Sequence, residues 1–582
     1  MSKAGRVEGR NRQATASMGA SMGASASWVA GALISALVWA LATAGAASAS
    51  NAAETAKTKA ARDLSPLELA ARIDAVLAAA WQAEGVAPAP PADDAEFLRR
   101  ASLDIIGKIP AASEVRAFLG DRSPDKRSRL VESLLARGGY ANHFANLWRE
   151  LLLPGANTSA ETRALAPPLE AWLRLRFAED TPYDRLVLEL LTPAAMAPAA
   201  LGVAQPASAA PSPLAFFQVN EYKPENLAAN ASRIFLGTQV QCAQCHDHPF
   251  ARWKRQEFWA LAAFFSGSSV VAQAQPPVDP NDADAETLQP VGLVASAEGK
   301  LAIQIPDTDL IAEARFLDGT APEFRAGEDS RLPLARWLTS RDNPYFARAL
   351  VNRLWEHFLG RGFVDPVDDL DEANPASHAE LFDEIAAQFA YRQYDIKYLV
   401  RAITATRAYQ LSSQSGGAGQ DDSRLFARMP LRRMSPEQLY DSLVQATGFR
   451  DATSQAQANV LQIDDTAQAR LKSLFADQTS RRSESQTSIL QALSLMNGAL
   501  VSDATSLERS ELLSAVAEMP FLDSAARVET LYLAALGRFP GEAEQKLMLD
   551  FLAERGAKVG EKRALADIFW ALLNSAEFIL NH

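Results

Sequence analysis

Residues 343–359 read NPYFARALVNRLWEHFL, and this stretch indicates the fold class of the chain. Leu350, Leu354 and Phe358 recur at a spacing of four, which places them on one face of an α-helix. The stretch begins with Asn-Pro, a pair that favours a helix start because Asn accepts hydrogen bonds from the first turn and Pro fits within it. The sequence therefore predicts an amphipathic helix that packs on a core.

The same pattern recurs along the chain. Residues 65–84 and 123–135 each begin with Ser-Pro and continue as amphipathic runs, and residues 225–236 are also predicted to be helical. Segments 107–110 and 537–540 read Gly-Lys-Ile-Pro and Gly-Arg-Phe-Pro after apolar runs, which predicts a repeated helix-turn-helix corner. We expect a mainly α fold, in which two helical domains are joined by a short insert that contains a β-hairpin.

Breaks in the helical pattern predict the domain boundaries. Residues 192–214 are rich in Ala, Pro and Ser without apolar periodicity, which is typical of a loop or an insertion. Two short apolar runs, 291–295 and 301–305, flank Glu-Gly-Lys and predict a β-hairpin. The expected segments are a signal peptide (1–49), a helical domain that carries both cysteines (64–268), a linker with the hairpin (269–314) and a second helical domain (315–580).

The N-terminal segment has the features of a signal peptide. Four basic residues precede the apolar run 28–41, and Ala-x-Ala sites follow at 44–46 and 47–49. The apolar run is shorter than the roughly 20 residues that a membrane-spanning helix needs. We expect cleavage near Ala49 and export to the periplasm or the cell surface, and an uncleaved N-terminal anchor is the alternative.

The amino-acid composition and net charge limit the classes of partner that the chain is expected to bind. The 582 residues are 48% hydrophobic, enough for a large core, and carry a formal charge of −13 that becomes −16 without residues 1–49. This acidity argues against nucleic acid and against an anionic membrane surface as partners. No second apolar stretch approaches spanning length, so we expect no transmembrane span in the mature chain. The sequence specifies no oligomeric state.

The chain has only two cysteines, and both lie in the motif Cys242-Ala-Gln-Cys245-His246. Two thiols at this spacing can bond to the two vinyl groups on one edge of a haem, and the next residue then places its imidazole under the iron. The motif therefore predicts one covalently attached haem c, with Cys242 and Cys245 as anchors and His246 as the iron ligand.

Two other interpretations of the motif are open. A C-x-x-C pair can be a redox disulfide, although the βαβ pattern of thioredoxin-like proteins is absent here. Cys242, Cys245, His246 and His248 can also form a zinc site, although both histidines would then lie within three residues of the second cysteine.

Residues near the motif are candidates for supporting roles. Asp247 and His248 follow it directly and are expected to orient the imidazole of the iron ligand. The aromatic residues Trp253, Trp259, Phe264 and Phe265 either form a wall for the haem or belong to the ordinary core. His378 is the first candidate for the sixth iron ligand, and otherwise it is a capping or surface residue at a helix start.

An acidic cluster precedes His378 and offers a rival site. Such carboxylates can hold a hard cation or act as acid and base, or they form a solvated loop. No catalytic residue is assigned. The cluster consists of Asp365, Asp368, Asp369, Asp371 and Glu372.

Longer stretches resemble a known family. Residues 103–107 (LDIIG) and 236–250 (LGTQVQCAQCHDHPF) look like the second planctomycete cytochrome-c-type domain, and the C-terminal half resembles the domain of unknown function that usually follows it. The resemblance covers nearly all of residues 64–580 and implies an exported protein with a haem site and no established reaction. The C-terminal resemblance rests on residues 352–355 (NRLW), 360–362 (GRG), 375–378 (PASH), 431–437 (LRRMSPE), 490–493 (LQAL) and 573–578 (LNSAEF).

These signals lead to one expected function and two alternatives. We expect an exported monohaem protein that exchanges electrons with a redox partner at the cell envelope. The first alternative is a non-redox scaffold that binds other exported envelope proteins and holds a structural zinc at the Cys/Cys/His/His cluster. The second is a hydrolase that uses the acidic cluster and His378, for which the sequence offers no known catalytic motif. The sequence leaves open whether the protein is an enzyme.

Overall fold

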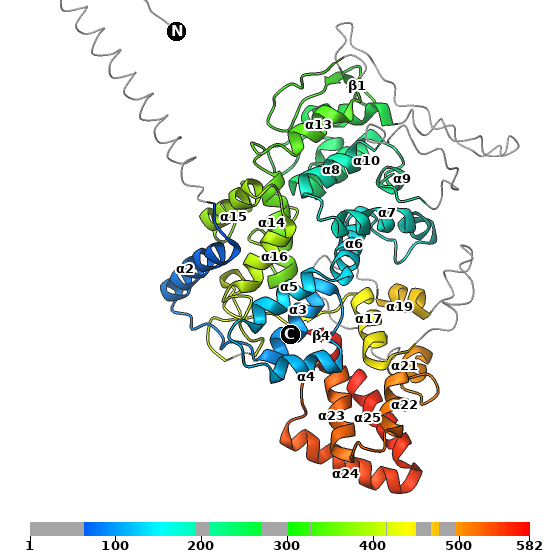
Figure 1. Cartoon of the computed structure of the whole chain (residues 1–582). Coiled ribbons are helices and arrows are strands. Elements are labelled where there is room, and N and C mark those ends of the chain that lie inside the picture. The colour runs from blue at the N-terminus through cyan, green and yellow to red at the C-terminus, as the bar shows by residue number, and fades with distance from the viewer. Residues whose placement is uncertain are drawn as a thin grey trace, which may run out of the picture. The chain divides into compact units, whose positions relative to one another are not determined.

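The architecture is that of a computed structural model (Figure 1), which describes residues 63–193, 210–268, 301–325, 328–414, 416–449, 467–475, 496 and 498–582. The predicted signal peptide, most of the Ala/Pro-rich insertion and the first arm of the predicted hairpin lie outside these residues. Within them helices dominate, and the strands form two small antiparallel sheets. The predicted mainly α fold is confirmed.

The first part of the described chain is helical throughout. The run predicted at 65–84 is helix α2, and its N-cap Ser65 accepts a hydrogen bond from the backbone N–H of Glu68. The run predicted at 225–236 is α10 followed directly by a π-helix. In chain order the elements are α2 (Pro66–Glu84), α3 (Asp94–Ile106), α4 (Ala112–Gly120), α5 (Lys126–Leu135), α6 (Gly138–Leu152), α7 (Ala160–Ala178), α8 (Tyr183–Leu191), α9 (Ala215–Val219), α10 (Pro224–Ala231), the π-helix η1 (Ser232–Leu236), the 3-10 helix η2 (Gln241–Gln244), α11 (Arg255–Ala262) and the 3-10 helix η3 (Ala263–Ser268).

The second part adds short strands to further helices. None of the helices in the described ranges is both long and apolar enough to cross a bilayer. The elements are β1 (Ala302–Gln304), β2 (Ile311–Glu313), α13 (Arg331–Leu338), α14 (Phe346–Leu359), α15 (Ala379–Tyr391), α16 (Ile396–Ala405), the 3-10 helix η4 (Ser423–Leu425), β3 (Arg432–Arg433), α17 (Pro436–Thr447), α19 (Ala467–Phe475), α21 (Ala499–Ala504), α22 (Glu511–Glu518), α23 (Ser524–Ala535), α24 (Glu542–Val559), α25 (Glu561–Leu573), α26 (Ala576–Ile579) and β4 (Leu580–Asn581).

Helix α14 forms where its sequence pattern predicts. The side-chain oxygen of Asn343 accepts hydrogen bonds from two backbone N–H groups of the first turn, at 2.9 and 3.0 Å. Leu350, Leu354 and Phe358 are all buried, as their spacing requires. Gly360 ends the helix in the left-handed conformation, with a φ of +80°.

The two similar Gly-x-x-Pro segments form equivalent corners, which confirms the predicted repeat. Gly107 follows α3 and Gly537 follows α23, with φ values of +74° and +72°. In each corner a glutamate, Glu114 or Glu544, accepts a hydrogen bond from the backbone N–H three residues before it. A Cβ placed on Gly537 would lie 3.9 Å from the ring of Pro110, so the corners contact each other.

The two sheets each contain two antiparallel strands. Strand β3 pairs with β4, which places Arg432 opposite Asn581. Strand β1 forms within the predicted run 301–305 and pairs with β2, the next strand along the chain. The partner predicted for it, residues 291–295, lies outside the described residues.

Two hydrophobic clusters form the core. The first is built from residues 69–429 together with Leu533, and the second from residues 434–578 together with Leu103 and Ile109 of the α3 region. The division between the clusters therefore falls near residue 430. Helix α3 contributes to both clusters and ties the N-terminal helices to the C-terminal ones.

Candidate functional site

The cysteine segment, residues 237–255, connects η1 to α11. Gly237 ends η1 with a φ of +63°. A Cβ at this glycine would lie 2.8 Å from a methyl group of Leu370, and the backbone N–H of Leu370 donates to the Gly237 carbonyl at 2.8 Å. Both the left-handed backbone and the close neighbour demand glycine, so the turn that begins the segment is fixed.

Helix η2 presents the two cysteines to solvent. Val240 and Ala243 are buried, whereas Cys242 and Cys245 are exposed and not joined in a disulfide. The apolar side chains thus anchor this single helical turn to the core. Both thiols remain accessible for covalent modification.

Helix α11 holds the end of η2 in place. The carbonyl oxygen of Gln244 accepts hydrogen bonds from the indole N–H of Trp259 at 3.0 Å and from Nε of Arg255 at 3.3 Å. Arg255 also donates through Nη2 to the carbonyl oxygen of Pro306, in the turn after β1. The residue before Cys245 is therefore tied to the core and to the β1–β2 hairpin.

The imidazole of His246 is oriented by the backbone of the next residue. Its Nδ1 lies 2.7 Å from the carbonyl oxygen of Asp247. Because a carbonyl oxygen can only accept, Nδ1 carries a proton, and in the neutral imidazole the lone pair that can bind a metal lies on Nε2. The Asp247 carboxylate instead accepts from the backbone N–H of Arg255 and from Lys254 Nζ, and these bonds lower its pKa.

His248 closes a turn within the cysteine segment. Its Nδ1 accepts hydrogen bonds from the backbone N–H groups of Ala251 and Phe250, at 2.8 and 3.3 Å. Its own backbone N–H donates to the carbonyl oxygen of Trp253 at 2.8 Å. The ring nitrogen that accepts carries no proton, so in the neutral imidazole the proton lies on Nε2.

This arrangement fits a zinc site poorly. To bind a metal through Nε2, His248 would have to give up either that proton or the two bonds to its Nδ1. In the described ranges no three His, Cys, Asp or Glu side chains are grouped as a metal site requires. The residues fit a covalently attached haem better, because two exposed thiols and an oriented Nε2 are what such attachment uses.

The aromatic residues around the motif belong mainly to the core. One aromatic side chain of the segment, Phe250, is instead 90% exposed and lies four residues after His246. Phe250 is therefore an exposed apolar ring within the cysteine segment. The buried aromatic residues are Trp253, Trp259, Phe264 and Phe265.

His378 lies at the N-terminus of α15 and makes no side-chain cap. Its ring contacts the rings of Phe363 and Phe426, and its Nδ1 lies 3.2 Å from the hydroxyl of Ser377. Partial burial lowers its pKa. None of these contacts involves the cysteine segment.

Arginines neutralise part of the acidic cluster. Asp365 forms an ion pair with Arg361 at 2.9 Å. Asp368 pairs with two arginines at once, Arg233 of η1 at 3.0 Å and Arg353 of α14. Two of the five carboxylates, Asp365 and Asp368, are therefore in ion pairs, whereas Glu372 is exposed.

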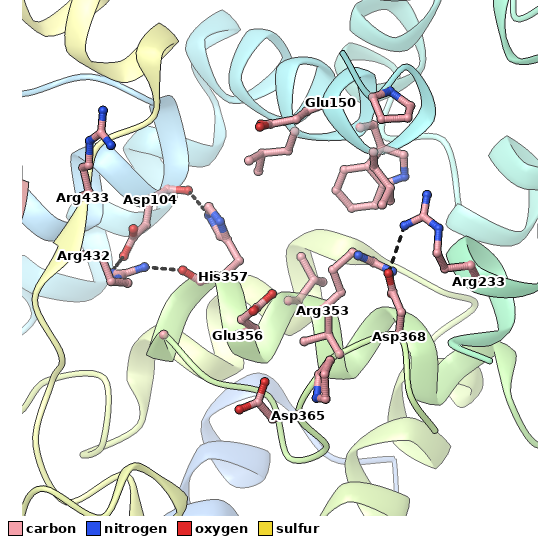
Figure 2. Close-up of a pocket in the computed structure, with 18 of the residues that line it drawn as sticks. Asp104, Glu150, Arg233, Arg353, Glu356, His357, Asp365, Asp368, Arg432 and Arg433 are labelled. Carbon is pink, nitrogen blue, oxygen red and sulfur yellow. Dashed lines mark hydrogen bonds and ion pairs between the residues drawn. The ribbon is translucent and has the colours of Figure 1, made fainter. Parts of the chain in front are cut away.

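Arg233, Arg353 and Asp368 line a cavity of about 580 Å³, which we call the junction pocket (Figure 2). Its walls come from α3, α6, η1, α14, residues 365–368, β3, α17 and β4. Gln239, three residues before Cys242, is also part of the wall. Sequence reasoning missed this pocket, because its residues are far apart in the chain.

The end of the pocket opposite Asp368 is a buried polar network (Figure 2). Asp104 accepts hydrogen bonds from Arg432 and Tyr409 at 2.9 Å and from Asn581 at 2.7 Å. The backbone carbonyl of Asp104 lies 2.9 Å from Nε2 of His357, whose own carbonyl accepts from Arg432. These bonds join α3 to α14, β3 and β4, so this end of the pocket is structural.

Comparison with known proteins gives two family matches. Residues 72–270 match the family described as PSCyt2, protein of unknown function (DUF1549), and residues 330–474 match PSD1, protein of unknown function (DUF1553). The two occur in the order that the sequence resemblance predicts. No curated protein and no solved structure matches the chain. The cysteine segment lies in the first match, and the junction pocket takes Arg233 from the first and Arg353 from the second.

Proposed function

We propose that this chain, which joins two segments from families of unknown function, is an exported monohaem c-type protein that transfers electrons at the cell envelope. The proposal rests on the exposure of the two cysteines and on the hydrogen bond of the adjacent histidine. Cys242 and Cys245 are both exposed on one helical turn, and the adjacent His246 has Nδ1 bound to a carbonyl oxygen. This is the arrangement that two thioether bonds and one imidazole ligand need.

The residues of the motif have separate roles in the proposed haem attachment. Cys242 and Cys245 would hold the haem covalently, and Nε2 of His246 would bind its iron, with the ring held by the Asp247 carbonyl. When bound, the haem supplies one-electron redox chemistry. Trp259 and Arg255 keep Gln244 fixed, which limits movement of the attachment site.

The exposure of the motif favours exchange with a partner over chemistry in a closed pocket. A haem held by two exposed thiols would lie near solvent, within reach of another protein. Solvent exposure is one of the factors that set a haem potential. Phe250, which is 90% exposed beside the motif, adds an apolar contact at the same surface.

The test is expression of the full chain in a host that matures c-type cytochromes. We expect a pyridine haemochrome spectrum typical of thioether-linked haem, and a haem mass on the peptide that contains Cys242 and Cys245. The double variant Cys242→Ala/Cys245→Ala should carry no covalent haem. A matured wild-type protein with no haem adduct, and with stoichiometric zinc, would establish the scaffold alternative instead.

A further inference from the structure

A second cavity, which we call the corner pocket, lies between the first Gly-x-x-Pro corner, the start of α6 and the middle of α17. Its volume is about 700 Å³, which is in the range of small-molecule sites. The corner and α6 lie in the family segment 72–270, whereas the lining part of α17 lies in the segment 330–474. Both family segments therefore contribute to this cavity.

Four charged side chains of the described residues line the corner pocket, and two of them neutralise each other. Arg137 at the start of α6 forms an ion pair with Glu114 of α4, at 2.7 Å. The other two, Lys108 of the corner and Asp441 of α17, carry opposite charges and are both partly buried. In the described part of the chain neither of these two side chains forms an ion pair or a hydrogen bond. The pocket thus offers one uncommitted cation and one uncommitted anion.

The protonation behaviour of Asp441 agrees with its lack of a close partner. Close pairing with a cation lowers the pKa of a carboxyl group, whereas burial raises the pKa of Asp441 to about 6 despite the attraction of Lys472 and Lys108. The ammonium of Lys472 lies 3.8 Å from the carboxylate of Glu437, so it already has a partner, and the charge of Glu437 adds to the rise. A carboxylate removed from water without a partner costs stability, and such groups in clefts are characteristic of functional sites.

We propose that the corner pocket binds a small zwitterion, a free amino acid or a short peptide, with its carboxylate against Lys108 and its ammonium against Asp441. The ligand supplies the two charges that these side chains lack, and hydrogen bonds between charged groups are stronger than those between neutral groups. The site goes beyond the proposed function and does not depend on haem attachment, because no residue of the cysteine motif lines this pocket.

The rest of the lining suits the uncharged parts of such a ligand. Asn142 and Gln445 line the pocket, and among the described residues their side chains have no hydrogen-bond partner. Their amides can both donate to and accept from a peptide group. Apolar surface for a ligand side chain comes from Ile106, Ile109, Val444 and Phe449.

The experiment measures binding to the full chain by calorimetry. The probes are leucine, phenylalanine and glycyl-leucine, each compared with its N-acetyl form, which lacks the ammonium, and with its amide, which lacks the carboxylate. We expect at least one zwitterion to bind about tenfold or more tightly than both of its counterparts. Asp441→Asn should abolish the preference over the N-acetyl form and keep the preference over the amide. Lys108→Gln should do the reverse.

Both substitutions remove a charge that has no ion-pair partner, so neither variant should unfold at a lower temperature than wild type. The matched controls are Lys546→Gln and Asp550→Asn, two exposed positions on α24, and both should keep both preferences. The proposal is overturned if no zwitterion binds more tightly than both counterparts, or if either pocket variant retains the preference that it should lose. Failure here leaves haem attachment untouched, since that is read from a separate mass and spectrum.

Discussion

The indole N–H of Trp259 donates a 3.0 Å hydrogen bond to the carbonyl oxygen of Gln244, the residue directly before Cys245. Trp259 lies on α11 and is buried in the hydrophobic core, whereas Cys245 is exposed. Trp259, together with Arg255, thus ties the surface turn that carries the thiols to the core.

Replacing this donor should loosen the motif. Trp259→Phe keeps an aromatic ring but removes the bond, so we expect a loss of about 1 kcal/mol in the free energy of unfolding. Backbone amides of residues 241–246 should exchange with deuterium faster. The matched control is Trp337→Phe, whose indole donates to the side chain of Asp318 instead. Equal exchange at 241–246 in both variants would contradict the role given to Trp259.

A second prediction concerns the buried acceptor Asp104. Asp104→Ala leaves the guanidinium of Arg432 in the core without its carboxylate, and we expect a loss of about 3–5 kcal/mol in the free energy of unfolding. Tyr409→Phe removes one of three donors and should cost only about 1 kcal/mol. Urea denaturation monitored by circular dichroism measures both. Similar losses of unfolding free energy in the two variants would contradict a large contribution from the ion pair between Asp104 and Arg432.

The sequence predicted those helices whose signals are local. The start of α2 at Pro66 and of α14 near Asn343 follow from capping residues and apolar spacing within one or two turns. The two Gly-x-x-Pro corners were found for the same reason. The division of the core near residue 430 could not be found this way, because Leu103 and Ile109 join the C-terminal cluster through tertiary packing.

The same difference between local signals and tertiary packing applies to the residues of the candidate site. Cys242, Cys245 and His246 are adjacent in the chain, so the motif alone reveals them. Arg233 and Arg353 are separated by 120 positions and meet only through Asp368. The acidic cluster drew attention to Asp368, but nothing in the sequence indicates which cations face it.

The pH dependence of stability should show the effect of Asp441. Burial, with a smaller contribution from Glu437, raises its pKa from 3.8 to about 6. The folded state therefore keeps a proton that the unfolded chain has already lost between these values, so this group lowers stability as pH rises from 4 to 8. Asp441→Asn removes the effect and should gain about 2 kcal/mol over wild type at pH 8 relative to pH 4.

The measurement for Asp441 is urea denaturation of both proteins at pH 4 and pH 8. Asp550→Asn on α24 is the control, because Asp550 is an exposed aspartate that undergoes the same chemical change. A gain for Asp441→Asn that is the same at both pH values would contradict the raised pKa.

Substitution of the two histidines of the cysteine segment distinguishes haem attachment from a scaffold with a structural metal. His246 has a lone pair on Nε2, whereas His248 uses Nδ1 to close the turn to Ala251. In matured protein, His246→Ala should change the absorption spectrum of the haem, because it removes the proposed iron ligand. His248→Ala should leave that spectrum unchanged while increasing amide exchange at residues 250 and 251, which lose their acceptor. If the two variants alter the bound group equally, both histidines are ligands, and a Cys/Cys/His/His metal site explains the segment better than a haem does.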